Sequence, residues 1–73
     1  MFYNVTLHKK DYPQLPYKLG VQAKTNEEAI QIAKDIIVKK AYWGEDPNMT
    51  DEDKSNILIV DEVQGYELQG TID

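Results

Sequence analysis

The chain has 73 residues, of which 41% are hydrophobic and 29% are charged, and its formal net charge is −5 at pH 7. This length allows one domain, residues 1–73, and this composition is typical of a globular chain and excludes a disordered one. The negative charge argues against direct nucleic-acid binding by phosphate neutralisation, and the absence of cysteine excludes disulfides and thiolate metal sites.

The N-terminal part contains two segments in which apolar and polar residues alternate. The apolar positions are Tyr3, Val5 and Leu7 in the first segment, and Tyr17, Leu19, Val21 and Ala23 in the second. Period-two alternation is typical of strands that bury one face. A loop with two prolines separates them, so we expect an antiparallel hairpin.

An amphipathic helix is expected next. Thr25 and Glu28 have the spacing of a capping box, in which each side chain binds a backbone N–H at the start of a helix. Apolar residues then recur at spacings of three and four: Ala29, Ile30, Ala33, Ile36 and Ile37. This stripe predicts a helix that packs on a sheet and ends at Gly44.

Residues 42–55 form an acidic loop in a chain whose charge is divided unevenly. Residues 1–40 carry seven lysines and four carboxylates, which sum to +3, whereas residues 41–73 carry one lysine and nine carboxylates, which sum to −8. A field of one sign selects partners of the opposite sign. The candidate partner-binding residues are Tyr42, Trp43, Glu45, Asp46, Asp51, Glu52 and Asp53. Thr50 and Asp53 could also cap a short helical turn within this loop.

Two further strands complete the predicted fold. Ile57 to Val60 is apolar at every position, Gln64 and Gly65 suggest a tight turn, and residues 66–72 alternate again. The prediction is therefore an α+β domain, β-β-α-β-β. Its mainly antiparallel sheet has four strands in the order 2-1-3-4, with one helix on one face.

The opposite sheet face would be uncovered. Phe2, together with either Ile57 and Ile59 or Leu58 and Val60, would place apolar side chains on it. Exposed apolar area favours a homodimer or a docked partner, although tyrosine rings and lysine stems are an alternative cover.

Trp43 allows two interpretations. It is a binding hot spot for a basic partner, or it folds back and closes the end of the core. The second interpretation is preferred, because a large aromatic side chain in a small domain is more often packed than displayed.

Asp51, Asp53, Ser55 and Glu62 have the spacing of a calcium-binding loop, but Asn56 replaces its glycine and no second helix is predicted to follow. We therefore expect no metal and no cofactor. With one histidine, one serine and no cysteine, a nucleophilic pair is limited to His8 and Ser55, so we expect no enzymatic activity.

The junction between the second strand and the helix resembles small accessory proteins of unassigned function that phages and plasmids of Gram-positive bacteria encode. The residues that carry this resemblance are Val21, Ala23, Thr25, Glu27, Glu28, Ala29, Ile30 and Ala33. The resemblance implies an α+β domain of phage or mobile-element origin.

The sequence as a whole predicts a cytoplasmic protein-interaction domain without membrane contact, because it has neither a signal peptide nor an apolar run that spans a bilayer. The alternative is an acidic mimic of nucleic acid that inhibits a host DNA-binding protein. Its carboxylates would be Glu45, Asp46, Asp51, Glu52, Asp53, Asp61, Glu62 and Glu67.

Overall fold

The computed structural model describes residues 1–44 and 48–66. The domain is α+β, as predicted, with a three-stranded antiparallel sheet and two helices in the described residues. The elements in chain order are β1 (Phe2–Lys9), β2 (Tyr17–Gln22), α1 (Asn26–Lys40), α2 (Asp51–Asn56) and β3 (Leu58–Tyr66).

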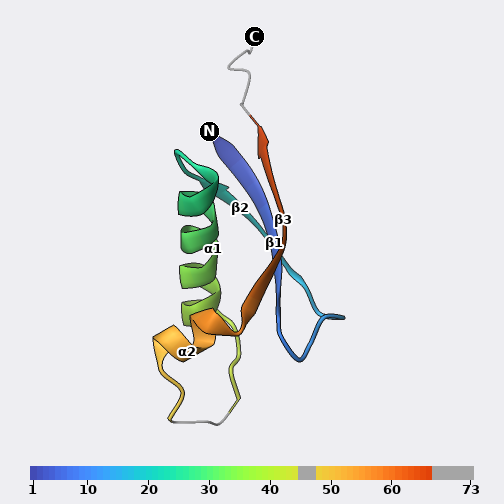
Figure 1. Ribbon diagram of the computed structural model, residues 1–73, viewed down its shortest axis with the longest axis vertical. Helices are drawn as coiled ribbons and strands as arrows, with labels where there is room; N and C mark the ends of the chain where they lie inside the picture. Colours follow the sequence, from blue (N-terminus) through green and yellow to red (C-terminus); the bar gives the residue numbers. More distant parts are fainter. Residues whose placement is uncertain (45–47, 67–73) are drawn as a thin grey trace.

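The sheet has the strand order β2-β1-β3, and α1 packs across one of its faces (Figure 1). β1 is the central strand, with Val5 paired to Leu19 on one side and to Val63 on the other. The predicted order of the first three strands is confirmed. α2 lies at one end of the molecule, below the C-terminal end of α1 in this view.

The core lies between α1 and the sheet, and the predicted alternation places it correctly. Its buried residues come from β1, β2 and the residue that follows it, α1 and β3: Tyr3, Val5, Leu7, Val21, Ala23, Ala29, Ala33, Ile37, Val38 and Leu58. Small alanines at two consecutive turns of α1 let the helix approach the sheet closely, since larger side chains would hold the two layers apart.

The N-terminus of α1 is capped as predicted, with one difference. The backbone N–H of Glu28 donates to Thr25 Oγ1 at 3.1 Å, but the Glu28 carboxylate accepts from the N–H of Lys24 at 2.7 Å. The predicted box placed this second bond on Thr25. The Glu28 side chain therefore binds the chain one residue before the cap.

The helix ends at Lys40, so the prediction that Gly44 ends it is wrong. Ala41 is the C-cap, with extended backbone angles of φ −76° and ψ 157°, and its N–H donates to the carbonyl of Ile37. Gly44, at φ +79°, lies beyond this point in the following segment. The Trp43 indole donates a hydrogen bond to the same carbonyl and so holds the chain where it leaves the helix.

β3 differs from the prediction at both ends. Ile57 is the C-cap of α2, so the strand begins at Leu58. The predicted turn at Gln64 and Gly65 is wrong, because both residues lie within β3 opposite Asn4 and Tyr3. A β-carbon on Gly65 would come 2.8 Å from Tyr3 Cε1, so a close approach to the Tyr3 ring requires glycine here.

The four-stranded order 2-1-3-4 is not confirmed. Tyr66, predicted to open the fourth strand, belongs to β3, and residues 67–72 lie outside the described residues. The third strand, predicted to be central, lies at an edge of the described sheet.

A register shift between Thr6 and Leu7 marks a bulge in β3. Leu7 pairs with Val60 and Thr6 pairs with Glu62, so Asp61 is the extra residue. The bulge allows both Val60 and Val63 to face the core.

Candidate functional site

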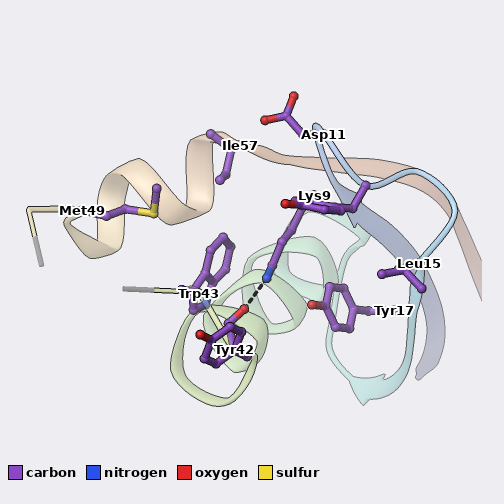
Figure 2. Close-up of a pocket in the computed structure, with 10 residues that line it drawn as sticks. Lys9, Asp11, Leu15, Tyr17, Tyr42, Trp43, Met49 and Ile57 are labelled. Carbon is purple, nitrogen blue, oxygen red and sulfur yellow. Dashed lines mark hydrogen bonds between the residues drawn. The ribbon is translucent and has the colours of Figure 1, made fainter. Parts of the chain in front are cut away.

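A pocket of about 510 Å³ lies at the end of the molecule where three segments meet. These segments are the end of β1 with the loop to β2, the chain after α1, and the flanks of α2 (Figure 2). We call this hollow the aromatic pocket. Its lining residues are Lys9, Asp11, Tyr12, Leu15, Tyr17, Tyr42, Trp43, Gly44, Met49 and Ile57.

Trp43 packs against the core and also lines the aromatic pocket. Its ring is half-buried, packs against the core and donates an indole hydrogen bond to the Ile37 carbonyl at 3.1 Å. This contact confirms the preferred interpretation, in which Trp43 closes the end of the core. The same ring also lines the aromatic pocket, so a partner there would contact the residue that closes the core.

Lys9 places a positive charge beside the Trp43 ring. Its ammonium lies 4.4 Å from the ring centroid and donates a hydrogen bond to the backbone carbonyl of Tyr42. Lys54 approaches the same ring, at 5.9 Å. The negative face of an aromatic ring attracts cations, so these two lysines hold β1 and α2 against the chain after α1.

The rim of the pocket exposes large apolar side chains. Tyr12 is 51% exposed, Leu15 is 62% exposed and Tyr42 is 73% exposed. Two of them come from the loop after β1, and Tyr42 lies across the pocket from that loop. Grouped aromatic and aliphatic side chains around a hollow are typical of a binding site.

The three predicted acidic residues that the structure describes, Asp51, Glu52 and Asp53, are not among the lining residues of this pocket. Asp51, Glu52 and Asp53 form the first turn of α2, and Thr50 and Asp53 form the predicted capping box. Asp51 and Glu52 line a second hollow of about 290 Å³ between α1 and α2. Glu45 and Asp46 lie outside the described residues.

The calcium-loop spacing falls on a helix and a strand. Asp51, Asp53 and Ser55 lie in helix α2, and Glu62 lies in strand β3, so these residues do not form one loop. Among the described residues, no group of three or more histidine, cysteine, aspartate or glutamate side chains could hold a metal ion.

The sheet face opposite α1, which we call the open face, is largely polar. Phe2 and Ile59 lie on it, and Phe2 stacks on Tyr66 with ring centroids 6.1 Å apart. Leu58 and Val60 face the core instead. The paired residues between Phe2 and Ile59 are polar: Asn4 with Gln64, and Thr6 with Glu62. The apolar side chains therefore stand at two separate ends of this face, and self-association through it stays a prediction.

His8, the histidine of the proposed nucleophilic pair, is bound to a carboxylate. Its Nδ1 lies 2.8 Å from Asp61 Oδ2, and its side chain is only 13% exposed. Ser55 lies in α2, and no contact between Ser55 and His8 is found in the described part of the chain. No local pattern indicates the His8–Asp61 pair, because 53 positions separate the two residues.

Only Tyr42 and Trp43 of the predicted site residues line the pocket. The other lining residues were not predicted as site residues: Lys9, Asp11, Tyr12, Leu15, Tyr17, Gly44, Met49 and Ile57. The sequence does contain a signal for Tyr12 and Leu15. They are large apolar residues beside prolines in a loop between strands, where no strand can bury them, so an exposed apolar surface could have been predicted there. No such signal exists for Lys9, which reaches Trp43 only through the fold.

Comparison with known proteins adds no family to this picture: no family model, no curated protein and no solved structure matches the chain. Within the described residues, no helix has the length and apolar character needed to cross a membrane. Function is therefore inferred from the pocket.

Proposed function

We propose that this chain is a non-enzymatic protein-interaction domain that binds a partner segment in the aromatic pocket. The observation that carries this proposal is a pocket of about 510 Å³ whose walls include the rings of Tyr12, Tyr17, Tyr42 and Trp43. Its volume lies within the range of roughly 300 to 1,000 Å³ that is usual for ligand pockets. Binding energy at protein interfaces is concentrated on such aromatic side chains.

The exposure of the rim supports a partner side chain as the occupant. Leu15 and Tyr42 are among the most exposed large apolar residues of the described chain. An apolar side chain between them would remove this surface from water, which stabilises a complex by about 25 cal/mol per Å² before ordering costs are subtracted.

The acidic first turn of α2 adds a preference for basic residues beside the apolar side chain. Asp51 and Glu52 are exposed, and neither forms an ion pair with another described residue. Met49 and Ile57, which line the pocket, flank this helix on both sides. A partner segment with lysine or arginine next to its apolar residue would therefore meet charges of opposite sign.

The test selects peptides from a random display library on the immobilised domain and measures their affinity by calorimetry. We expect peptides that combine a large apolar residue with lysine or arginine. Leu15→Ala and Tyr42→Ala should each weaken binding about tenfold, the effect of removing a contact worth about 1.4 kcal/mol. Ile59→Ala, which removes an exposed apolar side chain from the open face, is the matched control. Equal loss in the control would place the contact elsewhere and contradict the proposal.

The alternative function, an acidic mimic of nucleic acid, predicts a different pattern. Its described carboxylates divide between the first turn of α2 and the middle of β3, where Asp61 is bound to His8. A mimic would bind a DNA-binding protein in a strongly salt-sensitive manner. The double substitution Asp51→Asn and Glu52→Gln would weaken this binding, whereas Tyr42→Ala would leave it unchanged. Phage origin and cytoplasmic location stay predictions from the sequence.

A further inference from the structure

We infer that the occupant of the aromatic pocket is the C-terminal residue of a partner chain, with a large apolar side chain and a free carboxylate that binds Lys9. This inference rests on the proposed function, because it names the group that the same pocket accepts. Lys9 is then the residue that selects the ligand.

Lys9 places a positive charge at the wall of the aromatic pocket. Among the described residues that line the pocket, Lys9 is the one with a positive charge and Asp11 the one with a negative charge. The Lys9 ammonium has three N–H donors, and the described contacts use one of them for the Tyr42 carbonyl. Figure 2 shows this ammonium between Trp43 and Tyr42, whereas Asp11 points away from both. The described charge beside the Trp43 ring and the Tyr42 carbonyl is therefore positive.

An occupant of the pocket must supply a hydrogen-bond acceptor to the Lys9 ammonium. An apolar side chain alone would take water away from the Lys9 ammonium without supplying an acceptor, and burial of an unpaired charge is costly. A carboxylate would supply that acceptor and form a charge-assisted hydrogen bond. A cationic side chain would be repelled by Lys9, and both Lys9 and Lys54 already approach the Trp43 ring.

The C-terminal carboxylate of a chain fits this pocket better than the carboxylate of an internal acidic residue. In an extended segment, successive side chains point to opposite sides, so an aspartate or glutamate next to the apolar residue would face away from the pocket. At a C-terminal residue the carboxylate and the apolar side chain leave the same Cα atom. Both groups then enter one pocket, while lysine or arginine residues upstream reach Asp51 and Glu52 on α2.

The test compares three short peptides that share two lysines, a glycine spacer and one phenylalanine. One ends in phenylalanine with a free carboxylate, one has the same end as an amide, and one carries an internal aspartate beside the phenylalanine and an amidated end. Calorimetry with the whole chain should show that the free carboxylate binds at least about tenfold more tightly than either of the others.

Lys9→Met should bring the acid and amide peptides to the same affinity, within about twofold, because it keeps the apolar stem and removes the charge. Lys18→Met, which removes an exposed lysine from β2, is the control and should keep the difference. Should Lys9→Met fail to fold, the acid and amide peptides on the unmodified chain still decide the question.

The outcomes separate the two proposals. Acid and amide peptides that bind equally tightly would overturn this inference and leave the proposed function standing. Preference for the internal aspartate would overturn the choice of a chain terminus. If none of the three peptides binds and display selects none, the proposed function itself fails.

Discussion

Replacement of Trp43 by alanine tests whether this residue joins the core to the pocket. Trp43 is half-buried, donates a hydrogen bond to Ile37 and lies 4.4 Å from the Lys9 ammonium. A neutral hydrogen bond contributes about 1 kcal/mol net, and a partly exposed cation–π contact contributes about 0.5 to 1 kcal/mol. Replacing a fully buried tryptophan by alanine costs about 3 to 5 kcal/mol of stability. Trp43 is half-buried, so the loss of its packing contacts should cost less than this.

We therefore expect Trp43→Ala to lower the free energy of unfolding by about 3 kcal/mol, out of a total of about 4 to 10 kcal/mol for a chain of this length. Trp43→Phe keeps an aromatic ring and loses the indole N–H, so it should cost about 1 kcal/mol. Leu15→Ala, at an exposed position on the pocket rim, should cost less than about 0.5 kcal/mol.

The assay is urea denaturation followed by far-ultraviolet circular dichroism, because the substitution removes the tryptophan fluorescence. The slope against urea should stay constant, so that changes in midpoint report stability alone. A cost for Trp43→Ala no larger than that for Leu15→Ala would refute the conclusion that the ring closes the core.

Three other substitutions test the fold, each by a separate measurement. Gly65→Ala should lower stability by about 1 to 3 kcal/mol in urea denaturation, because the new β-carbon would lie 2.8 Å from the buried Tyr3 ring. Gly20→Ala is the control and should not lower stability in this way, because the nearest atom to its new β-carbon would lie at 3.8 Å. Thr50→Ala removes the cap of α2, worth about 1 kcal/mol, and since α2 buries no residue, hydrogen exchange should accelerate in that helix while the sheet keeps its protection. Leu7→Ala creates a cavity at a fully buried position, and it should lower the free energy of unfolding by about 2 to 5 kcal/mol in the same denaturation assay. Equal effects of the two glycine substitutions would contradict the close contact with Tyr3. Unchanged exchange in α2 would contradict the capping role of Thr50. A cost below about 1 kcal/mol for Leu7→Ala would contradict its full burial.

Local patterns predicted the elements whose residues interact with near neighbours in the chain. Alternation placed Val5 and Leu7 in the core, and the spacing of Thr25 and Glu28 located the start of α1. The Thr50 capping box was found in the same way. In each case the information lies within a few residues, which is the range over which strand faces and helix caps are determined.

The errors occurred where a long-range contact decides the structure. Gly65 resembles a turn residue in isolation, and only the Tyr3 ring on the neighbouring strand explains why it lies in a strand. The end of α1 similarly depends on Trp43, whose indole binds back to Ile37. Sequence patterns carry no direct record of such contacts.

The candidate site was predicted in part for the same reason. Tyr42 and Trp43 were identified as candidates from their chemistry, and both line the pocket. Lys9 ends β1 and Leu15 lies in the loop to β2, far from Tyr42 in the sequence, so only the fold brings them to the pocket.

The indole N–H signal of Trp43, the one tryptophan in the chain, reports directly whether a partner occupies the aromatic pocket. A selected peptide titrated into the isotope-labelled domain should shift this nuclear magnetic resonance signal saturably, with the dissociation constant found by calorimetry. Shifts confined to the open face, at Asn4, Thr6 and Gln64, with an unmoved Trp43 signal would contradict the account.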